Sequence, residues 1–530
     1  MFLFVYSCLF YHILIANPHW KKLPSCDFYN FFKSTMKHFK QALIASVVNI
    51  LFASSGNALA SEGFWDAAAN RVTKEYNSKE WKELPDEALI LSSKIKWNRL
   101  AKAALNLPEW MEFSLSQRTR YESVSHPWRS GQSSSTDVQL PLQSRIRLGV
   151  NHGPFWLMFE GQDSRTHFAG PNDFNNNTVT NNFDILQLFG SATFRNINDT
   201  GLRADAHVGR MTLHIGSGRL VGRNGYRNTT NSFDGAHFAI GNDKDWRVRA
   251  FLTSPVQIDK THLDEGSSSR LFWGAVFETS QLSWLNGEAY YYGINDKKDS
   301  SKTRTFSTFG IRGYQSPAKI AKFQKQDFGK VDYEFEGAAQ TGKASGKNLF
   351  AYMGHAEVGY TFNAPWFPRF NAEYDYASGT NDPNGNNNHT FDRLFGIRRS
   401  DMMQTGIFGP FFRSNIESVG TRLTLQPRDD LKLFVKHHVW YLAEAKDAFA
   451  GSNLTGFKQL QDKTGNAGRF LGHDLELVAS WKLKSNIVVE AGYEHWFKGD
   501  YFDRLPASAG LPAGGNKDSD YFFVSTEFRF

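Results

Sequence analysis

The sequence has only two cysteines, few prolines and no long apolar run beyond its amino-terminal region. Cys8 and Cys26 both lie within residues 1–35, so a disulfide framework is excluded for the rest of the chain. After residue 60 no stretch approaches the roughly 20 consecutive apolar residues that a membrane-spanning helix needs, which excludes helical spans there. Membrane-spanning strands are still allowed, because they alternate apolar and polar residues.

The amino-terminal region has the pattern of a secretory signal peptide. Met36–Lys40 is short and basic, Gln41–Phe52 is apolar, and Ala58 and Ala60 form a small-x-small cleavage site. We therefore expect residues 36–60 to direct export and to be removed. An exported chain without cysteines must be stabilised in another way, here by a large closed hydrogen-bonded structure.

The remaining domain boundaries follow from changes in composition. Residues 1–35 are expected to be an upstream extension from a mis-assigned start, with a genuine long leader or a membrane anchor as the alternative. Residues 61–107 are rich in charge, alanine and lysine and are expected to form a periplasmic lead-in, with the barrel domain at 108–530. Removing the first 60 residues, which hold five Lys and one Asp, lowers the formal charge from +7 to 7 − 4 = +3. The basic balance is therefore no argument for nucleic acid.

From Glu112 onward, segments of about ten residues alternate apolar and polar side chains. In the first of them Phe113, Leu115 and Tyr121 share one face, and Arg118 and Arg120 share the other. This pattern predicts eighteen antiparallel strands, an even number as bacterial barrels require. The segments are 111–121, 138–150, 154–165, 184–195, 202–215, 236–241, 246–254, 270–278, 284–295, 305–314, 332–340, 348–362, 368–378, 414–426, 431–443, 474–481, 487–497 and 520–530.

The connections between these segments alternate between tight turns and long polar loops. Examples of tight turns are "NHGPF" and "GNDKD", whereas long loops follow Thr166, Ser254 and Ser378. This alternation is typical of an outer-membrane barrel with both termini in the periplasm, short periplasmic turns and long extracellular loops. The connection at 316–330 is long but falls on the short side. A soluble sandwich or propeller is disfavoured because charge recurs on the second face of successive strands, which a packed core could not hold.

The last segment, "YFFVSTEFRF", is expected to be the final strand and to pair with the first, near "FSLSQRTRYE". Closure of a barrel leaves no free edge. Phe522, Phe528 and Phe530 share one face of this segment and are expected to face lipid. Phe528 and Phe530 are also expected to be the signal that the outer-membrane assembly machinery reads.

The chain resembles the alginate-export outer-membrane barrels over residues 108–530. The resemblance is carried by "FSLSQRTRYESV", "VGRMTLHIGSGRLVGR", "DYEFEGAAQTG", "PRFNAEYDYASGTNDPNG", "RSNIESVG" and "GHDLELVASWKL" in this order. It implies an 18-stranded barrel through which a polyanionic polysaccharide leaves the cell past a constriction of arginines, whose fixed charges can hand carboxylates along. By position, Arg210 and Arg413 match the arginines of the family's pore. The adjacent Arg-Glu pair of the family's alginate secretor is absent from "FDILQLFGSATF".

Alternation along the strands adds further candidates for the lining of the pore. The predicted basic lining is Arg118, Arg120, Arg145, Arg147, Arg210, Arg312, Arg413 and Arg422; the predicted acidic lining is Glu122, Glu160, Glu334, Glu336, Glu373, Asp375, Asp474 and Glu476. Inward Arg and Glu on neighbouring strands also pair simply to fill and stiffen a barrel. Structural and permeation roles therefore both remain open for each arginine.

The sequence favours a channel for an alginate-like polysaccharide or for other anionic solutes. A general or uptake porin for small anions is the alternative, and a barrel-embedded lipid hydrolase or a non-conducting structural barrel are alternatives of another class. No metalloprotease or serine-hydrolase motif occurs, so we expect no enzyme activity, cofactor or metal. The expected surroundings are outer-membrane lipid and lipopolysaccharide, the assembly machinery, and export partners in the periplasm, with no nucleic acid.

Overall fold

The protein is described here by a computed structural model. It describes residues 102, 104–129, 136–167, 176–242, 245–267, 269–297, 303–316, 328–397, 399, 402–403, 406–450 and 460–530. All of its strands lie within one compact unit of the chain, beyond residue 107. The predicted extension, the signal peptide with Ala58 and Ala60, and nearly all of the predicted lead-in lie outside the described residues and stay predictions.

Eighteen long strands in the described part of the chain form the wall. They are β1 (Met111–Val124), β2 (Asp137–His152), β3 (Phe155–His167), β4 (Asn181–Ile197), β5 (Leu202–Met211), β6 (Phe233–Gly241), β7 (Trp246–Pro255), β8 (Arg270–Leu282), β9 (Leu285–Asp296), β10 (Arg304–Gln315), β11 (Gly329–Ala344), β12 (Lys347–Phe362), β13 (Arg369–Ala377), β15 (Ile416–Arg428), β16 (Leu431–Tyr441), β17 (Phe470–Lys484), β18 (Ile487–Lys498) and β19 (Ser519–Arg529). The two-residue strand β14 (Asn387–Asn388), the short helix α5 (Asp500–Arg504) and the 3₁₀ turn η5 (Ala507–Ala509) lie in connections. Each predicted segment corresponds to one long strand.

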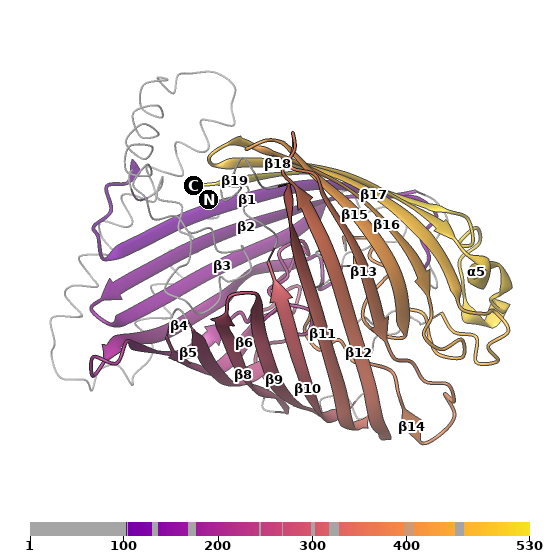
Figure 1. The fold of residues 1–530 in the computed structure, drawn as a ribbon, viewed down its shortest axis with the longest axis horizontal. Coiled ribbons are helices and arrows are strands. Elements are labelled where there is room, and N and C mark those ends of the chain that lie inside the picture. Colours follow the sequence, from indigo (N-terminus) through magenta and orange to yellow (C-terminus); the bar gives the residue numbers. More distant parts are fainter. Residues whose placement is uncertain are drawn as a thin grey trace. The chain divides into compact units, whose positions relative to one another are not determined.

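The wall closes on itself because the last strand pairs with the first. Each long strand is antiparallel to its neighbours along the chain, and β1 pairs with both β2 and β19. In the β1–β19 register, Arg118 lies opposite Glu527 and Tyr121 opposite Val524. The predicted closure is thus confirmed, and no edge is left among these strands. Figure 1 shows the strands tilted around this barrel.

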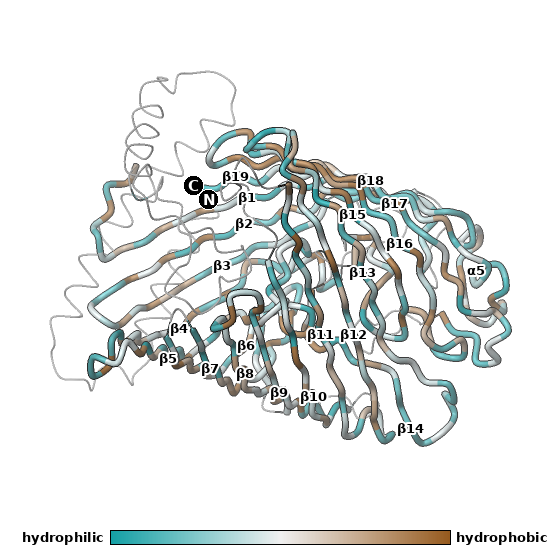
Figure 2. Tube along the Cα trace, in the orientation of Figure 1, coloured by the Kyte–Doolittle hydropathy of each residue, from teal (hydrophilic) through white to brown (hydrophobic). Residues whose placement is uncertain are grey.

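Side chains alternate between the two faces of the wall as the sequence pattern predicts. On β1, Arg118, Arg120 and Glu122 are buried, whereas Thr119 and Tyr121 between them are exposed. The outer face carries large apolar side chains such as Phe309, Phe335 and Val419. Figure 2 shows hydrophilic and hydrophobic residues alternating along the strands. Apolar side chains on the outside and charged side chains on the inside are typical of a barrel whose outer face contacts lipid.

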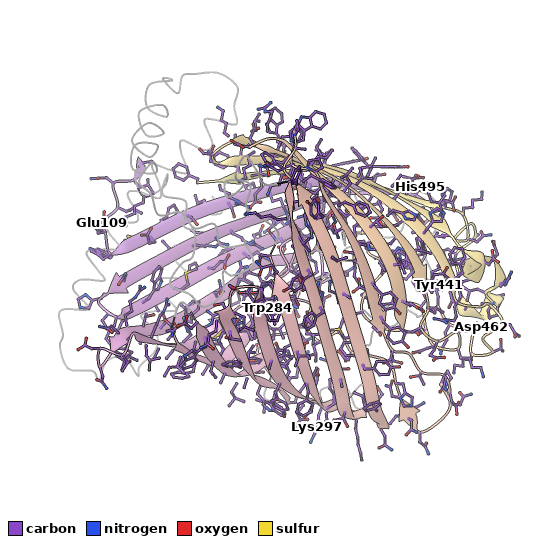
Figure 3. The ribbon with its side chains drawn as sticks, viewed as in Figure 1. Glu109, Trp284, Lys297, Tyr441, Asp462 and His495 are labelled. Atoms are coloured by element: carbon purple, nitrogen blue, oxygen red, sulfur yellow. The ribbon has the colours of Figure 1, made fainter. Side chains whose placement is uncertain are left out.

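The connections gather by length at the two ends of the barrel. At the long-loop end lie Lys297, which follows β9, and Asp462, which lies between β16 and β17; at the short-turn end lies Trp284, between β8 and β9 (Figure 3). The predicted exception is present as well, since β10 ends at Gln315 and β11 begins at Gly329. None of the helices in the described part of the chain has the length and apolarity needed to cross a bilayer.

One strand boundary differs from the sequence expectation in a way that shapes the interior. The pattern predicts a strand through Ile215, but β5 ends at Met211. The backbone N–H of Thr212 donates to the side-chain oxygen of Gln187 on β4 (3.0 Å) instead of continuing the ladder. Residues 212–215 therefore leave the wall. Leu213 and Ile215 join a buried apolar cluster with Phe233 and Phe272 of the wall, so part of the lumen is packed like a soluble core.

Candidate functional site

Two long connections enter the lumen. The first inserted segment, residues 212–232, contacts inward side chains on both sides of the barrel. Its Arg223 pairs with Glu160 of β3 at 2.7 Å, and its Arg219 pairs with Glu336 of β11 at 2.9 Å. Going around the wall, β3 and β11 are separated by seven strands in one direction and nine in the other. The first inserted segment therefore crosses the lumen and is fixed to the wall at both ends.

The glycines of "GSGRLVG" allow the sharp course of this segment. Gly216 and Gly218 adopt positive φ angles of 60° and 76°, which residues with a side chain rarely take. A Cβ on Gly222 would approach the carbonyl oxygen of Gly218 to 2.7 Å. The sequence thus forms a tight loop and presents Arg219 and Arg223 to opposite walls.

The second inserted segment, which comprises the described residues of 389–415 (389–397, 399, 402–403 and 406–415), meets the first within the lumen. Val221 and Phe395 form a parallel bridge, in which the N–H of Phe395 donates to Leu220 (2.9 Å) and the N–H of Gly222 donates to Phe395 (3.1 Å). The ring of Phe395 packs edge-on against Phe233 and Phe272 of the wall, at centroid distances of 5.1 and 4.9 Å. The two segments form one hydrogen-bonded and apolar unit.

Three arginines converge on a single carboxylate where the first inserted segment meets β2 and β3. Glu160 is fully buried and lies 2.8 Å from Arg147, 2.7 Å from Arg223 and 4.0 Å from Arg145. Arg145 also donates to Gln162 (2.9 Å) and Thr230 (3.0 Å). One carboxylate thus faces three fixed positive charges. We call Arg145, Arg147, Arg223 and Glu160 the basic cluster.

The predicted arginines of β1 hold the first inserted segment rather than standing free in the lumen. Arg118 donates to the carbonyl oxygens of Gly225 and of Arg227 (3.1 Å). Arg120 pairs with Glu122 and donates to the carbonyl oxygen of Tyr226 (2.7 Å). Both arginines face inward as predicted, and their hydrogen bonds anchor the segment's backbone to the wall.

A second group of predicted residues anchors the same segment on the opposite wall. Arg312 bridges Glu288 and Glu334, each at 2.9 Å, and Glu334 also accepts from Arg219. Glu336 accepts from Arg219 (2.9 Å), from the hydroxyl of Ser217 (2.6 Å) and from Tyr290 (2.9 Å). Glu334 and Glu336 therefore anchor the first inserted segment to β11.

The remaining predicted residues lie where the second inserted segment meets β13 to β18. Arg413 pairs with Asp375 at 2.5 Å, and Asp375 also contacts His355 at 2.8 Å. Glu373 contacts Lys436 at 3.0 Å. Asp474 accepts a hydrogen bond from the indole N–H of Trp440 at 2.7 Å. Glu476 lies opposite Lys436 of β16 and Glu494 of β18. The guanidinium of Arg422 lies 5.2 Å from the ring centre of Phe434. Arg413 thus belongs to a buried anchor.

Arg210 departs from its predicted position. It shares a face of β5 with Val208, which is 66% exposed, and lies in register with Leu188, which is 44% exposed. It therefore belongs to the outer side of the wall, where it pairs with Asp234 at 2.7 Å and donates to the carbonyl oxygen of Asp264 (2.9 Å). The lumen position inferred for Arg210 was carried over by resemblance, and the side-chain alternation of β5 overrides it.

At the closing strand, Phe522 and Phe528 are exposed on the outer face as expected, but Phe530 is only 9% exposed. Phe530 exchanges two backbone hydrogen bonds with Leu115 of β1, at 2.6 and 2.7 Å. Leu115 lies on the face of β1 that also carries the exposed Tyr121, so Phe530 shares the outer face with Phe528, and contact of its ring with lipid stays a prediction. The role of Phe528 and Phe530 as an assembly signal stays a prediction.

The sequence pattern did not single out Arg219, Arg223 or Tyr226 as functional. They lie in a connection, where period-two alternation carries no information about direction. The available signal was the pair of arginines spaced by glycines in "GSGRLVGR". That signal indicates a structured loop and not its destination, which depends on partners more than 100 residues away in the chain, Glu334 and Glu336.

His214 makes docking of the first inserted segment sensitive to acid. Burial, followed by the guanidinium groups of Arg249, Arg312 and Arg223, lowers the pKa of His214 to about 4. A released imidazole titrates near 6.5, so docking is fully stable above that value and loses up to roughly 3 kcal/mol as the pH falls to 4. We expect the channel current of the wild type to become noisier across this window.

Single-channel recordings between pH 7 and pH 4 check this expectation. The variant His214→Asn keeps an acceptor for the backbone N–H of Arg223 but does not titrate, and should remain quiet. His262→Gln, at an exposed loop position, is the matched control and should behave as the wild type. Equal noise in the wild type and in His214→Asn at pH 4 would assign the effect to another group.

Two observations concern the features that an enzyme or a metal centre would need. The lipid-hydrolase alternative requires an outward serine that is hydrogen-bonded to a histidine. In the described part of the chain, the outward His495 instead contacts Asp520 at 2.7 Å, and Ser125 donates to the other oxygen of the same carboxylate (3.0 Å). Within the described residues, no group of three or more His, Cys, Asp and Glu side chains is arranged to hold a metal ion.

The sequence matches the family described as "Alginate export" over residues 109–513. The fold is similar to those of Pseudomonas aeruginosa OpdQ (TM-score 0.54, 11% identity, covering 80% of this chain and 99% of that one) and Acinetobacter baumannii OccAB3 (0.53, 11%, 79% and 99%). It is also similar to that of P. aeruginosa OpdL (0.50, 13%, 79% and 98%). At these identities the likeness shows the fold alone. A search of curated proteins finds no similar sequence.

Proposed function

Since this chain belongs to the alginate export family, we propose that its lumen passes anionic solutes, with an anionic polysaccharide of the alginate type as the cargo. Family and fold are those of channels in the bacterial outer membrane, and the protein is an outer-membrane barrel of this kind. What the proposal adds is the sign of the charge that passes and the side chains that select it.

The observation that carries the proposal is the basic cluster. Arg145, Arg147 and Arg223 surround a single carboxylate, Glu160, and their side chains keep 12%, 24% and 15% of their surface exposed, whereas Glu160 keeps none. A guanidinium is always charged and can hold a uronate carboxylate with two parallel hydrogen bonds. Three of them within reach of one another can pass a carboxylate from one to the next.

A channel for small anionic solutes is the second candidate, and the meeting of the two inserted segments favours it. Their parallel bridge between Val221 and Phe395 lies in the lumen and divides the cross-section. A polymer would have to thread beside this unit or displace it, whereas a small anion needs neither. The two candidates share the basic cluster and differ in the size of the cargo.

The orientation and the partners belong to the same proposal. The difference in connection length between the two ends supports extracellular long loops and periplasmic termini. Lipopolysaccharide would then surround the long-loop end, and export partners would meet the short-turn end. The outer-membrane assembly machinery would insert the barrel.

Current block in planar bilayers tests the cargo. We expect an oligouronate added to one side to reduce the ion current through the wild type, and a neutral oligosaccharide of equal length to have no comparable effect. Arg145→Gln/Arg147→Gln should weaken the block about a hundredfold or more, because it removes two of three charges worth about 1.5 kcal/mol or more each in charge-assisted bonds, and about 1.4 kcal/mol is a factor of ten.

The matched control for this pair is Arg165→Gln, which removes an arginine from the outer face of β3, where Arg165 pairs with Asp163. It should leave the block unchanged. Equal block by charged and neutral oligosaccharides would contradict an anion-recognising lumen. Block by a single uronic acid, but not by the oligomer, would favour the small-solute channel.

A further inference from the structure

The lumen wall from β13 around to β1 carries many carboxylates, yet these are sealed. Glu122 of β1, Asp474 of β17 and Glu494 of β18 are 0% exposed, Glu476 of β17 is 2% exposed and Glu373 of β13 is 3% exposed. Two cationic side chains on this wall, Arg120 of β1 and Lys436 of β16, are equally buried, and Arg120 pairs with Glu122. In an open barrel these inward residues would face water, so something covers them.

The cover is the stretch 406–412 of the second inserted segment. The backbone N–H of Ile407 donates to Glu122 at 2.9 Å. Gly406 lies so close to this carboxylate that a Cβ there would stand 2.6 Å from both of its oxygens. The cover therefore touches the acid directly with its backbone, beside the ion pair that Glu122 makes with Arg120.

Two aromatic rings extend the cover over the acids of β17 and β18. Phe411 stacks on Trp440 at a centroid distance of 4.0 Å and an interplanar angle of 8°, and the indole N–H of Trp440 donates to Asp474 (2.7 Å). Phe408 stacks on Tyr521, the neighbour of Glu494 in the β18–β19 register. The rings place apolar surface between these carboxylates and the lumen.

The cover is held from both of its flanks. Arg129 and Trp128, in the connection after β1, donate to the carbonyl oxygen of Phe408 at 2.9 and 3.2 Å. On the other side Arg413 pairs with the buried Asp375 at 2.5 Å. The side chains of Arg129 and Trp128 thus fix the uncharged backbone of the cover, and the ion pair between Arg413 and Asp375 fixes the residue that follows it.

The basic cluster lies under no such cover. Its arginines keep 12–24% of their side-chain surface exposed, while the covered acids keep at most 3%. A charge that faces the lumen can be approached closely by a passing ion, whereas apolar rings in front of a charge keep the ion farther away, and the interaction weakens with distance and with the salt between them. The net field in the lumen depends on which charges are covered.

We propose that residues 406–412 determine the charge selectivity of the channel, by shielding the lumen from Glu122, Glu373, Asp474, Glu476 and Glu494. This inference rests on the proposed anion channel and deepens it. With the cover in place the basic cluster dominates and anions pass in preference. With the cover removed the acid-rich wall faces the lumen and cations are favoured.

The reversal potential in a potassium chloride gradient measures this selectivity. We expect Phe408→Ser/Phe411→Ser, which removes both stacking rings, to lower the chloride-to-potassium permeability ratio several-fold. Adding Glu476→Gln/Glu494→Gln to that variant should restore much of the anion preference, because the uncovered wall then carries less negative charge. Phe470→Ser is the control, since Phe470 packs on Tyr441 of the outer face.

A second experiment tests the shield even if the Phe408→Ser/Phe411→Ser variant does not fold. Glu476→Gln/Glu494→Gln in the barrel with its native cover should leave the permeability ratio unchanged, because these side chains are already shielded. A clear shift there contradicts the shield. A folded Phe408→Ser/Phe411→Ser barrel with unchanged selectivity contradicts it as well. A wild type without anion preference overturns the proposed function itself, which separates the two failures.

Discussion

Replacing Val524 by proline is expected to prevent the barrel from closing. Val524 lies in the middle of β19, opposite Tyr121 of β1 and Ala491 of β18. Proline lacks the N–H that the ladder uses, and in the middle of a sheet it removes a ladder hydrogen bond, which confines it to edge strands and bulges. Because β19 joins the last hairpin to the first strand, the loss falls on the seam. We expect no compact, heat-modifiable band on gels and no channel activity.

The control for this prediction is Val524→Thr, which keeps the backbone N–H and a β-branched side chain. It should assemble and conduct as the wild type does. A Val524→Pro barrel that remains compact and conducts would show that pairing of β1 with β19 is not what closes the wall.

Replacing Glu336 by alanine is expected to loosen the attachment of the first inserted segment to β11 and to raise the single-channel conductance. Glu336 is 4% exposed and accepts from Arg219, Ser217 and Tyr290. Removing one partner of an isolated buried ion pair costs about 3–5 kcal/mol, and the loss here is smaller because Arg219 keeps its pair with Glu334. Arg223 would still hold the other end, so the segment should swing rather than leave the lumen. Larger and more variable unitary currents in bilayer recordings would report this.

Glu357→Ala is the matched control, since Glu357 pairs with Arg369 within the wall and touches neither inserted segment through that pair. It should leave the conductance close to that of the wild type. If Glu336→Ala shows the same conductance and the same resistance to protease as the control, the ion pair with Arg219 does not restrain the segment.

The architecture could be predicted from the sequence because each strand carries its own signal. Apolar and polar residues alternate at period two, and every one of the eighteen predicted segments overlaps a strand. The exception in detail was β5, whose apolar and polar alternation continues in the sequence through Leu213 and Ile215. Those side chains are apolar because they pack inside the lumen and not because they face lipid, and local pattern cannot separate the two.

The candidate site could be predicted only in part. Inward direction on β1, β2 and β11 followed from alternation, and Arg120, Arg147 and Glu336 lie as predicted. Arg210 was placed by resemblance, and its register with Leu188 shows the opposite face. The basic cluster needed Arg223, and the shield needed Phe408 and Phe411, all from connections. Their positions depend on contacts between distant parts of the chain, for which the sequence has no periodic signal.

Ion pairs in the structure also change the roles that the sequence assigns to the arginines. Counted along the sequence, they form a row of positive charges; in the structure Arg120, Arg312 and Arg413 each pair with carboxylates. Such pairs fix the inserted segments. In the proposed channel the selective charge is therefore the local excess around Glu160, which counting residues could not locate.

The sign of the reversal potential of the wild-type channel tests the account most directly. In a planar bilayer with a potassium chloride gradient, the account predicts a reversal potential displaced toward the chloride equilibrium potential, because Arg145, Arg147 and Arg223 face the lumen while the acids of β17 and β18 are covered. A displacement toward the potassium equilibrium potential, or no current from folded protein, would contradict it.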